Sequence, residues 1–417
     1  MDSICVQGGI ALQGEVPIQG SKNAALPILA ATLLVGERSF IRNCPRIADV
    51  YAMVSLLKAM GCQVNWQEQG ILVDSSRVQG HEMQSEAVKG MRSSLCLLGA
   101  MIGRCNEVVM EHPGGCVIGQ RPIDLHLWAL GQMGVAFGET QGLLSATADR
   151  LCGARICLPK PSVGATENII LAAVMAEGDT LIEGAAREPE IVALCGYLCA
   201  CGAWIQGAGT ACIRIRGGQR LYGTDYTVPA DRIVAGTYLF ACIAAGGNIF
   251  LEHAPGEDMG AVLTVAGRMG ARLCTSREGI YVQAPPRPLS TDRIITAPYP
   301  GFPTDLQSSA LVAAALGEGV TLVEETIFEN RFRVVEELRK MGGRMEMLDT
   351  GKLLVRGVDT LQGALVEAKE LRGGAALVAA ALAAKGESVI RGCLYINRGY
   401  ENICRDFREL GARVIGA

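Results

Sequence analysis

The chain has 417 residues, 49% of them hydrophobic, and its 38 basic residues nearly balance 42 acidic ones, for a formal net charge of −4 at pH 7. This length exceeds what one hydrophobic core usually supports, so we expect two domains. The absence of a basic block argues against a nucleic-acid partner, and apolar runs well short of about 18 residues argue against a membrane span.

The first 75 residues show how the chain is built. Apolar residues recur at helical spacing from Asn23, with Pro27 tolerable in a first turn, and Gly36 stops this helix. After a short strand, Asp49 is positioned to cap a second amphipathic helix that Gly61 ends. The unit therefore reads as roughly βαβαββ: helix 23–35, strand 39–42, helix 49–60, and strands at Val64 and 71–74.

This unit recurs six times along the chain. Each copy opens on a small, Gly/Ala-rich helix start, and the glycines that close its second helix stand 68 to 73 residues apart. The openings begin at Lys22, Arg92, Gly164, Asp231, Asp305 and Arg372, and the closing glycines are Gly61, Gly134, Gly202, Gly270, Gly342 and Gly411. So steady a period predicts two α/β domains of three repeats each.

The sixth repeat is truncated, because only six residues follow Gly411. Residues 4–15 resemble residues 353–364, which precede another opening, so we expect the N-terminal segment to complete the last sheet. The domains are then residues 1–21 with 230–417, and residues 22–229. Two crossings between them predict a hinge, with the active site in the interdomain cleft.

Cations occupy the helix starts. A helix N-terminus offers unpaired N–H groups and a partial positive charge, so a cation there suits a phosphate or carboxylate. Four openings carry one, at Lys22, Arg92, Arg232 and Arg372, and turn-like segments add Arg121, Lys160, Arg331 and Arg398. A lone arginine is usually only a solvated surface residue. Recurrence at equivalent positions nevertheless favours an anionic substrate.

Sixteen cysteines are scattered through apolar patterns, and we expect most of them to be buried free thiols. The tightest cluster, Cys195, Cys199 and Cys201, lacks the further Cys pair or His partners typical of a zinc site. Cys116 differs, because it lies in the glycine-rich loop 112–122, where nearby cations favour a thiolate that can donate a proton or add to carbon. No export signal is visible, so we expect a cytoplasmic protein.

Five motifs in order carry a specific resemblance. They are Gly20 to Pro27, Pro113-Gly114-Gly115-Cys116 with Gly119 and Arg121-Pro122, Arg187 to Glu190, Phe302 to Asp305, and Glu329 to Phe332. Together, and on to Asn397–Glu401, they are similar to the UDP-N-acetylglucosamine 1-carboxyvinyltransferases of the EPSP synthase/enolpyruvyl transferase family. The resemblance implies a two-domain inverse α/β barrel, or α/β prism, with helices inside and sheets outside.

By this resemblance the chain transfers the enolpyruvyl group of phosphoenolpyruvate to the 3′-hydroxyl of UDP-N-acetylglucosamine. Phosphate leaves through a tetrahedral ketal, in a cleft that closes by induced fit. The reaction is the first committed step of peptidoglycan synthesis, and so serves cell-wall biogenesis, cell shape and cell division. No metal or organic cofactor is implied, and the partners are the two small-molecule substrates.

The resemblance also implies roles for individual residues. Cys116 is expected to donate a proton and to form an adduct with phosphoenolpyruvate, Asp305 to act as base or orienting group, and Lys22 and Arg398 to complete the catalytic set. Phosphoenolpyruvate is expected to bind Lys22, Asn23, Arg121, Arg331, Arg372 and Arg398. The nucleotide sugar is expected to bind Asn23, Arg92, Arg121, Pro122, Ile123, Asp124, Leu125, Lys160, Ser162, Val163, Asp305 and Ile327. A phosphonate epoxide that mimics phosphoenolpyruvate is expected to alkylate Cys116.

Other interpretations remain at this stage. Asp305 read in isolation is a helix N-cap. A 3-phosphoshikimate 1-carboxyvinyltransferase would share the fold, although that family's pattern lacks the Pro-Gly-Gly-Cys loop, and a non-catalytic nucleotide-sugar sensor is a third possibility. Two departures from the family pattern, at Val234 or Ala235 and at Tyr395 to Asn397, alter the charge expected around Arg398.

Overall fold

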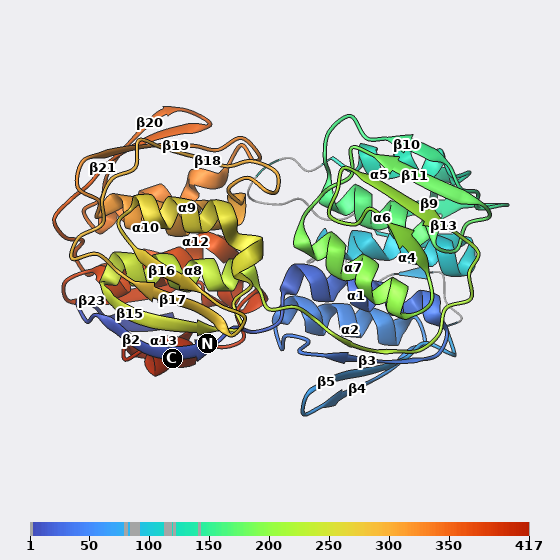
Figure 1. The fold of residues 1–417 in the computed structure, drawn as a ribbon, viewed down its shortest axis with the longest axis horizontal. Coiled ribbons are helices and arrows are strands. Elements are labelled where there is room, and N and C mark those ends of the chain that lie inside the picture. The colour runs from blue at the N-terminus through green and yellow to red at the C-terminus, as the bar shows by residue number, and fades with distance from the viewer. Residues whose placement is uncertain are drawn as a thin grey trace. The chain divides into compact units, whose positions relative to one another are not determined.

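The structure is a computed structural model that describes residues 3–78, 82–83, 92–111, 119, 122–140 and 143–416, with the backbone alone at 82, 83, 92, 93 and 140. The described chain forms two compact units (Figure 1). The first unit holds residues up to Gln19, Gly119, and residues from Ala230 onward, and the second holds the rest of Gly20 to Pro229.

These bounds differ from the expected ones in two places. The first crossing between units follows Gln19 rather than residue 21. Gly119, expected in the second domain, groups with the first unit because its backbone lies against Glu329. Gly119 has a φ of 150°, which residues with a Cβ rarely adopt, so glycine suits this position.

Each unit contains three four-stranded sheets. The strands of the first unit are β1 (Ser3–Gln7), β2 (Leu12–Pro17), β15 (Gly247–Glu252), β16 (Arg272–Thr275), β17 (Gly279–Gln283), β18 (Arg293–Ile295), β19 (Val320–Glu324), β20 (Arg344–Asp349), β21 (Lys352–Arg356), β22 (Leu365–Glu367), β23 (Glu387–Arg391) and β24 (Arg413–Gly416). Those of the second are β3 (Arg38–Arg42), β4 (Gln63–Gln67), β5 (Gly70–Asp74), β6 (Glu82–Met83), β7 (Glu107–Met110), β8 (Ala136–Thr140), β9 (Leu143–Thr147), β10 (Arg155–Cys157), β11 (Asp179–Glu183), β12 (Trp204–Gln206), β13 (Cys212–Arg216) and β14 (Asp225–Thr227).

All six sheets share one topology, which confirms the sixfold repeat. In the sheet β18-β19-β21-β20 the first pair of strands is parallel and the other two pairs are antiparallel. The sheet β22-β23-β1-β24 has the same order, with β1 in the place that β21 takes, and Ile4 lies opposite Ile390. The N-terminal strand thus supplies the strand that the truncated sixth repeat lacks.

The helices separate into a buried and a peripheral set. The first unit has α8 (Arg232–Ala245), α9 (Gly260–Arg268), α10 (Gln307–Ala315), α11 (Val334–Lys340), α12 (Leu371–Ala383) and α13 (Ile403–Glu409), and the second has α1 (Lys22–Val35), α2 (Ala48–Ala59), α4 (Cys96–Cys105), α5 (Asp124–Gly131), α6 (Val163–Ala173) and α7 (Pro189–Ala200). The central helices α8, α10 and α12 contact one another, as do α1, α4 and α6. Within each unit the sheets lie outside these helices (Figure 1).

Small residues let the central helices approach closely. All nine residues of α10 are buried, and most of α12 is buried alanine and glycine. A Cβ at Gly99 of α4 would come within 2.4 Å of the Asn168 carbonyl oxygen on α6, so this contact requires glycine. The Gly/Ala-rich openings of the repeats are therefore a packing requirement.

The six closing glycines share one backbone conformation. Gly61, Gly134, Gly202, Gly270, Gly342 and Gly411 all have φ between 81° and 107°. L-residues with a Cβ rarely adopt such values, so glycine ends the second helix of every repeat as the spacing predicted. In the part of the chain that is described, no helix is long and apolar enough to cross a membrane. The fifteen described cysteines are free thiols, and eight of them are buried.

The role of the N-terminal strand can be tested by truncating one of its buried side chains. Ile4 is 1% exposed in the core of the first unit, whereas Gln7 of the same strand is exposed. We expect Ile4→Ala to lower the free energy of unfolding by about 2–4 kcal/mol and Gln7→Ala to change it by less than about 0.5 kcal/mol. Urea unfolding followed by circular dichroism measures both, and equal effects would contradict a structural role for β1.

Candidate functional site

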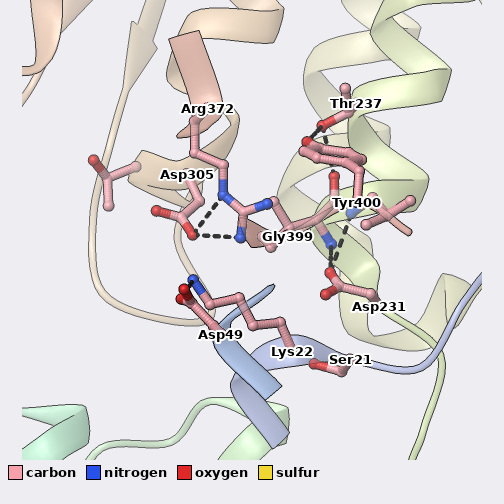
Figure 2. Close-up of polar contacts among 12 residues, drawn as sticks. Ser21, Lys22, Asp49, Asp231, Thr237, Asp305, Arg372, Gly399 and Tyr400 are labelled. Carbon is pink, nitrogen blue, oxygen red and sulfur yellow. Dashed lines mark hydrogen bonds and ion pairs between the residues drawn. The ribbon is translucent and has the colours of Figure 1, made fainter. Parts of the chain in front are cut away.

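Asp305 lies between two buried arginines of the first unit. Its Oδ1 accepts a hydrogen bond from Arg331 Nη2 at 2.9 Å. Its Oδ2 accepts from Arg372 Nε at 3.1 Å and Nη2 at 3.0 Å (Figure 2). The arginine side chains are 2% and 4% exposed, whereas that of Asp305 is 26% exposed. The N-cap reading of Asp305 is wrong, because its oxygens bind arginines and the short 3₁₀ helix Thr304–Leu306 has no side-chain cap.

Both arginines are held at helix starts. Arg372 is the second residue of α12, and the N-cap Glu370 accepts hydrogen bonds from the backbone N–H groups of Arg372, at 2.8 Å, and of Gly373. Arg331 opens a 3₁₀ turn, and its Nη1 lies 3.6 Å from Glu370 Oε2. Glu370 therefore caps α12 and also faces the second arginine.

Arg372 has a donor to spare for a ligand. Burial disfavours its charged form, but the carboxylates of Asp305 and Asp231 and the hydroxyl of Tyr400 outweigh burial and raise its pKa above the ordinary value. Among the described residues, its Nη1 is buried and has no hydrogen-bond partner. A permanent cation with an unused donor, at the start of a helix, suits a substrate carboxylate.

The loop that carries Arg398 is fixed by two residues of the same unit. Tyr400, on this loop, exchanges a 2.8 Å hydrogen bond with Thr237 of α8, and its ring centre lies 5.9 Å from Arg372 Cζ (Figure 2). The Gln19 side chain donates to the Gly399 carbonyl at 3.2 Å and accepts from the Glu401 N–H at 2.8 Å. These contacts hold the backbone on both sides of Tyr400.

In the second unit, Lys22 begins α1 and pairs with Asp49 of α2. Their Nζ and Oδ2 atoms are 2.7 Å apart, and both side chains are largely buried (Figure 2). The prediction that Asp49 caps α2 is wrong: Ile47 occupies the N-cap position without a side-chain bond. Periodicity placed Asp49 in the first turn correctly, but the cation of α1 is its partner.

Asn23 is the second residue of α1, and the other described candidates of this unit lie in or next to α5 and α6. Ser162 caps α6, its Oγ accepting from the Ala165 N–H at 3.4 Å. Asn168 of α6 lies 3.0 Å from the ring of His126 and accepts a 2.6 Å hydrogen bond from the Gly99 N–H, which ties α4, α5 and α6 together. This arrangement sets the positions of two segments, 122–125 before and within α5 and 160–163 before and at the start of α6.

An acidic side chain with an unusual protonation state lies on α6. Burial, and then the negative charges of Glu190 and Glu188, raise the pKa of Glu167 to about 8. Glu190 lies in the first turn of α7 and Glu188 is its N-cap residue. Glu167 is therefore largely protonated at neutral pH.

The predicted site residues fall into three groups. Asp305, Arg331 and Arg372 are in direct contact, and Ile327 and Arg398 lie in the same unit. Lys22, Asn23, Pro122, Ile123, Asp124, Leu125, Lys160, Ser162 and Val163 belong to the second unit. Cys116, Arg121 and the side chain of Arg92 lie outside the described residues.

Sequence reasoning missed several residues that organise the site. Glu370 could have been found as an acidic residue two positions before Arg372, where a cap is expected. Tyr400 lies in the segment Asn397–Glu401, which shares the family resemblance, but the sequence indicated no role for it. Gln19 and Thr237 carry no local signal, because their partners are 380 and 163 residues away.

The chain matches a known protein family and relatives with named activities. The model of the EPSP synthase (3-phosphoshikimate 1-carboxyvinyltransferase) family matches residues 6–407. The chain is 44% identical over 416 residues to UDP-N-acetylglucosamine 1-carboxyvinyltransferase 2 of Caldanaerobacter subterraneus, covering 100% of this chain and 99% of that protein. It is 41% identical to the UDP-N-acetylglucosamine 1-carboxyvinyltransferase of Desulfovibrio desulfuricans, covering 99% of each chain.

Solved structures agree. The enolpyruvyl transferase NikO from Streptomyces tendae superimposes with a TM-score of 0.89 at 25% identity, over 99% of this chain and 98% of its own. EPSP synthase from Acinetobacter baumannii reaches a TM-score of 0.76 at 18% identity, over 100% of both chains, which shows a shared fold alone. The predicted two-domain inverse α/β barrel is confirmed.

The raised pKa of Glu167 predicts a pH-dependent stability. Because the folded pKa, about 8, exceeds the ordinary value of 4.5, the stabilisation is complete below about pH 4.5 and is lost as pH rises through about 8. Glu167→Gln stays neutral, so we expect it to match the wild type near pH 5 and to exceed it by about 2 kcal/mol or more at pH 8.5. Urea unfolding at both pH values measures this, with the exposed Glu139→Gln as control. A pH-independent difference would contradict the assignment.

Proposed function

The chain belongs to the EPSP synthase family of carboxyvinyltransferases, and on that premise we propose that it transfers the enolpyruvyl group of phosphoenolpyruvate to the 3′-hydroxyl of UDP-N-acetylglucosamine, releasing phosphate. The full-length identity of 44% to a relative named for this activity carries the proposal. The same identity leads us to propose that the protein works in the cytoplasm. There it would catalyse the first committed step of peptidoglycan precursor synthesis, which supports cell-wall growth and division.

The chemistry requires a balanced addition and elimination. The 3′-hydroxyl loses its proton to a base and its oxygen bonds to C2 of phosphoenolpyruvate, while an acid delivers a proton to the C3 methylene. The resulting tetrahedral ketal then loses phosphate from C2 and a proton from C3, which restores the vinyl group on the new ether. The protein must supply a base, an acid, and cations against the phosphate and carboxylate.

Asp305 is our candidate for the base or orienting group. Its partly exposed carboxylate is held by Arg331 and Arg372, which limit its rotation. We assign the substrate carboxylate to the same two arginines, because both cations flank the partly exposed Asp305 and Arg372 Nη1 has no hydrogen-bond partner in the described chain. Cys116 is our candidate acid, and Lys22, Arg121 and Arg398 our candidates for the phosphate.

The nucleotide sugar is assigned to the second unit together with two residues of the first. In the second unit the proposed binding residues are Asn23, Arg92, Pro122 to Leu125, Lys160, Ser162 and Val163. The first unit contributes Ile327 and Asp305, and Arg121 is proposed to bind both the nucleotide sugar and the phosphate. The Ser162 cap and the α5–α6 contacts support this assignment, because they hold two of these segments on ordered helix starts. No step of this mechanism calls for a metal or organic cofactor.

Phosphate release tests the proposed reaction. We expect purified protein to release phosphate from phosphoenolpyruvate with UDP-N-acetylglucosamine and not with shikimate 3-phosphate. Release with the shikimate acceptor alone would instead assign the chain to the sister activity of its family. Binding of the nucleotide sugar without release under any condition would favour a non-catalytic sensor, and either result contradicts the proposal.

Replacements of Cys116 separate its acid function from its nucleophilicity. Cys116→Asp keeps an acid, so we expect turnover to persist while alkylation by a phosphonate epoxide is abolished, whereas Cys116→Ala should lose at least about 100-fold in kcat because proton delivery fails. Mass mapping of the label and steady-state kinetics measure both effects. Cys157→Ala, which removes an exposed thiol, is the control and should retain labelling and turnover. Full turnover by Cys116→Ala would remove this thiol from the mechanism.

A further inference from the structure

A buried carboxylate next to the Asp305 site serves no step of the proposed reaction. Glu325 directly follows β19 and is 6% exposed. Its Oε1 accepts hydrogen bonds from the backbone N–H groups of Ile327, at 2.8 Å, and Phe328, at 3.2 Å. Its Oε2 accepts from Thr304 Oγ1 at 3.0 Å. Within the described chain no lysine or arginine forms an ion pair with it, so these neutral donors hold the charge.

The donors belong to two segments with different proposed roles. Ile327 lies on the loop assigned to the nucleotide sugar, and Thr304 directly precedes Asp305. The carbonyl oxygen of Thr304 also accepts a 3.2 Å hydrogen bond from Arg331 Nε, and the same arginine binds Asp305. Thr304 is therefore held on its side chain by Glu325 and on its backbone by Arg331.

The segment around Glu325 has a second anchor in which neither Thr304 nor Asp305 takes part, although Thr296, its partner, also forms a β-bridge with Phe302. Thr326 donates through Oγ1 to the Thr296 carbonyl at 2.6 Å, and its N–H donates to Thr296 Oγ1 at 2.9 Å. This pair ties the segment to the end of β18. Thr326 already fixes the segment on the β18 side. The Glu325–Thr304 hydrogen bond therefore fixes the position of the 327–328 loop relative to Asp305.

We propose that Glu325 is a positioning residue that holds Asp305 in register with the nucleotide-sugar loop, acting through the hydroxyl of Thr304. The inference rests on the proposed function, since the register matters only if Asp305 and Ile327 meet the same acceptor. A hydrogen bond to a buried charge is stronger than one between neutral groups, which suits a fixed geometry. A small displacement of a reacting group costs up to about 100-fold in rate.

The test compares two threonines, of which only Thr304 forms a hydrogen bond with the Glu325 carboxylate. Thr304→Val removes the hydroxyl that Glu325 binds, and we expect kcat for phosphate release to fall by about tenfold or more, with KM for UDP-N-acetylglucosamine changed less than about threefold because Ile327 keeps its bond. Thr304→Ser retains the hydroxyl and should restore kcat to within about threefold. The control Thr326→Val loses the hydrogen bond from Oγ1 to the Thr296 carbonyl, and its kcat should stay near that of the wild type.

Thermal unfolding of the three variants distinguishes positioning from general destabilisation. We expect Thr304→Val and Thr326→Val to shift Tm by similar amounts while only the former lowers kcat. A Thr304→Val kcat within twofold of the wild type, or an equal loss in Thr326→Val, would overturn the inference. If Thr304→Val does not fold, Thr304→Ala removes the same hydrogen bond without placing a methyl group at the oxygen site and carries the same expectation. An inactive wild-type protein would refute the proposed function instead.

Discussion

The packing of three buried helices against one another determines where charged side chains can lie at the candidate site. In the first unit α8, α10 and α12 contact each other and consist largely of buried small and apolar residues. Asp231 and Asp305 lie just before α8 and α10, and Arg372 lies in the first turn of α12. The contact between Asp305 and Arg372 shows that two of these starts meet.

The charges collected there stabilise one another only as a set. Taking a guanidinium out of water costs on the order of several kcal/mol, and the Asp305 carboxylate, which contacts both Arg331 and Arg372, offsets part of that cost. Glu370 adds negative charge beneath the same cations while capping α12. A site assembled in this way holds one partly exposed carboxylate between two buried arginines.

Chain connectivity reinforces this arrangement. The first strand completes the sheet of the last repeat, and Gln19, the last residue before the crossing, binds both sides of Tyr400. The backbone carbonyl of Gln19 also accepts from the N–H of Asp231, the N-cap of α8. The residues at the crossings of the first unit are thus tied to the loop that carries Arg398.

The period of the sequence predicted much of the fold. Helix starts, closing glycines and strand order follow from spacing, because a repeat that cannot bury its apolar face alone must stack on its neighbours. The resemblance between residues 4–15 and 353–364 even indicated where the N-terminal strand belongs, and β1 does occupy the place of β21. Motifs read in order indicated the family, which the comparisons confirmed.

The partners of charged side chains, unlike the fold, were not predicted from the sequence. Asp49 and Asp305 both read as helix caps, since local rules assign a short acidic residue at a helix start to its own backbone. Folding brought a cation from another element to each of them. The sequence by itself determined which segments become helices and strands and which family they form. Only the tertiary structure decided which charge faces which, because those partners lie far apart in the chain and no local pattern encodes their meeting.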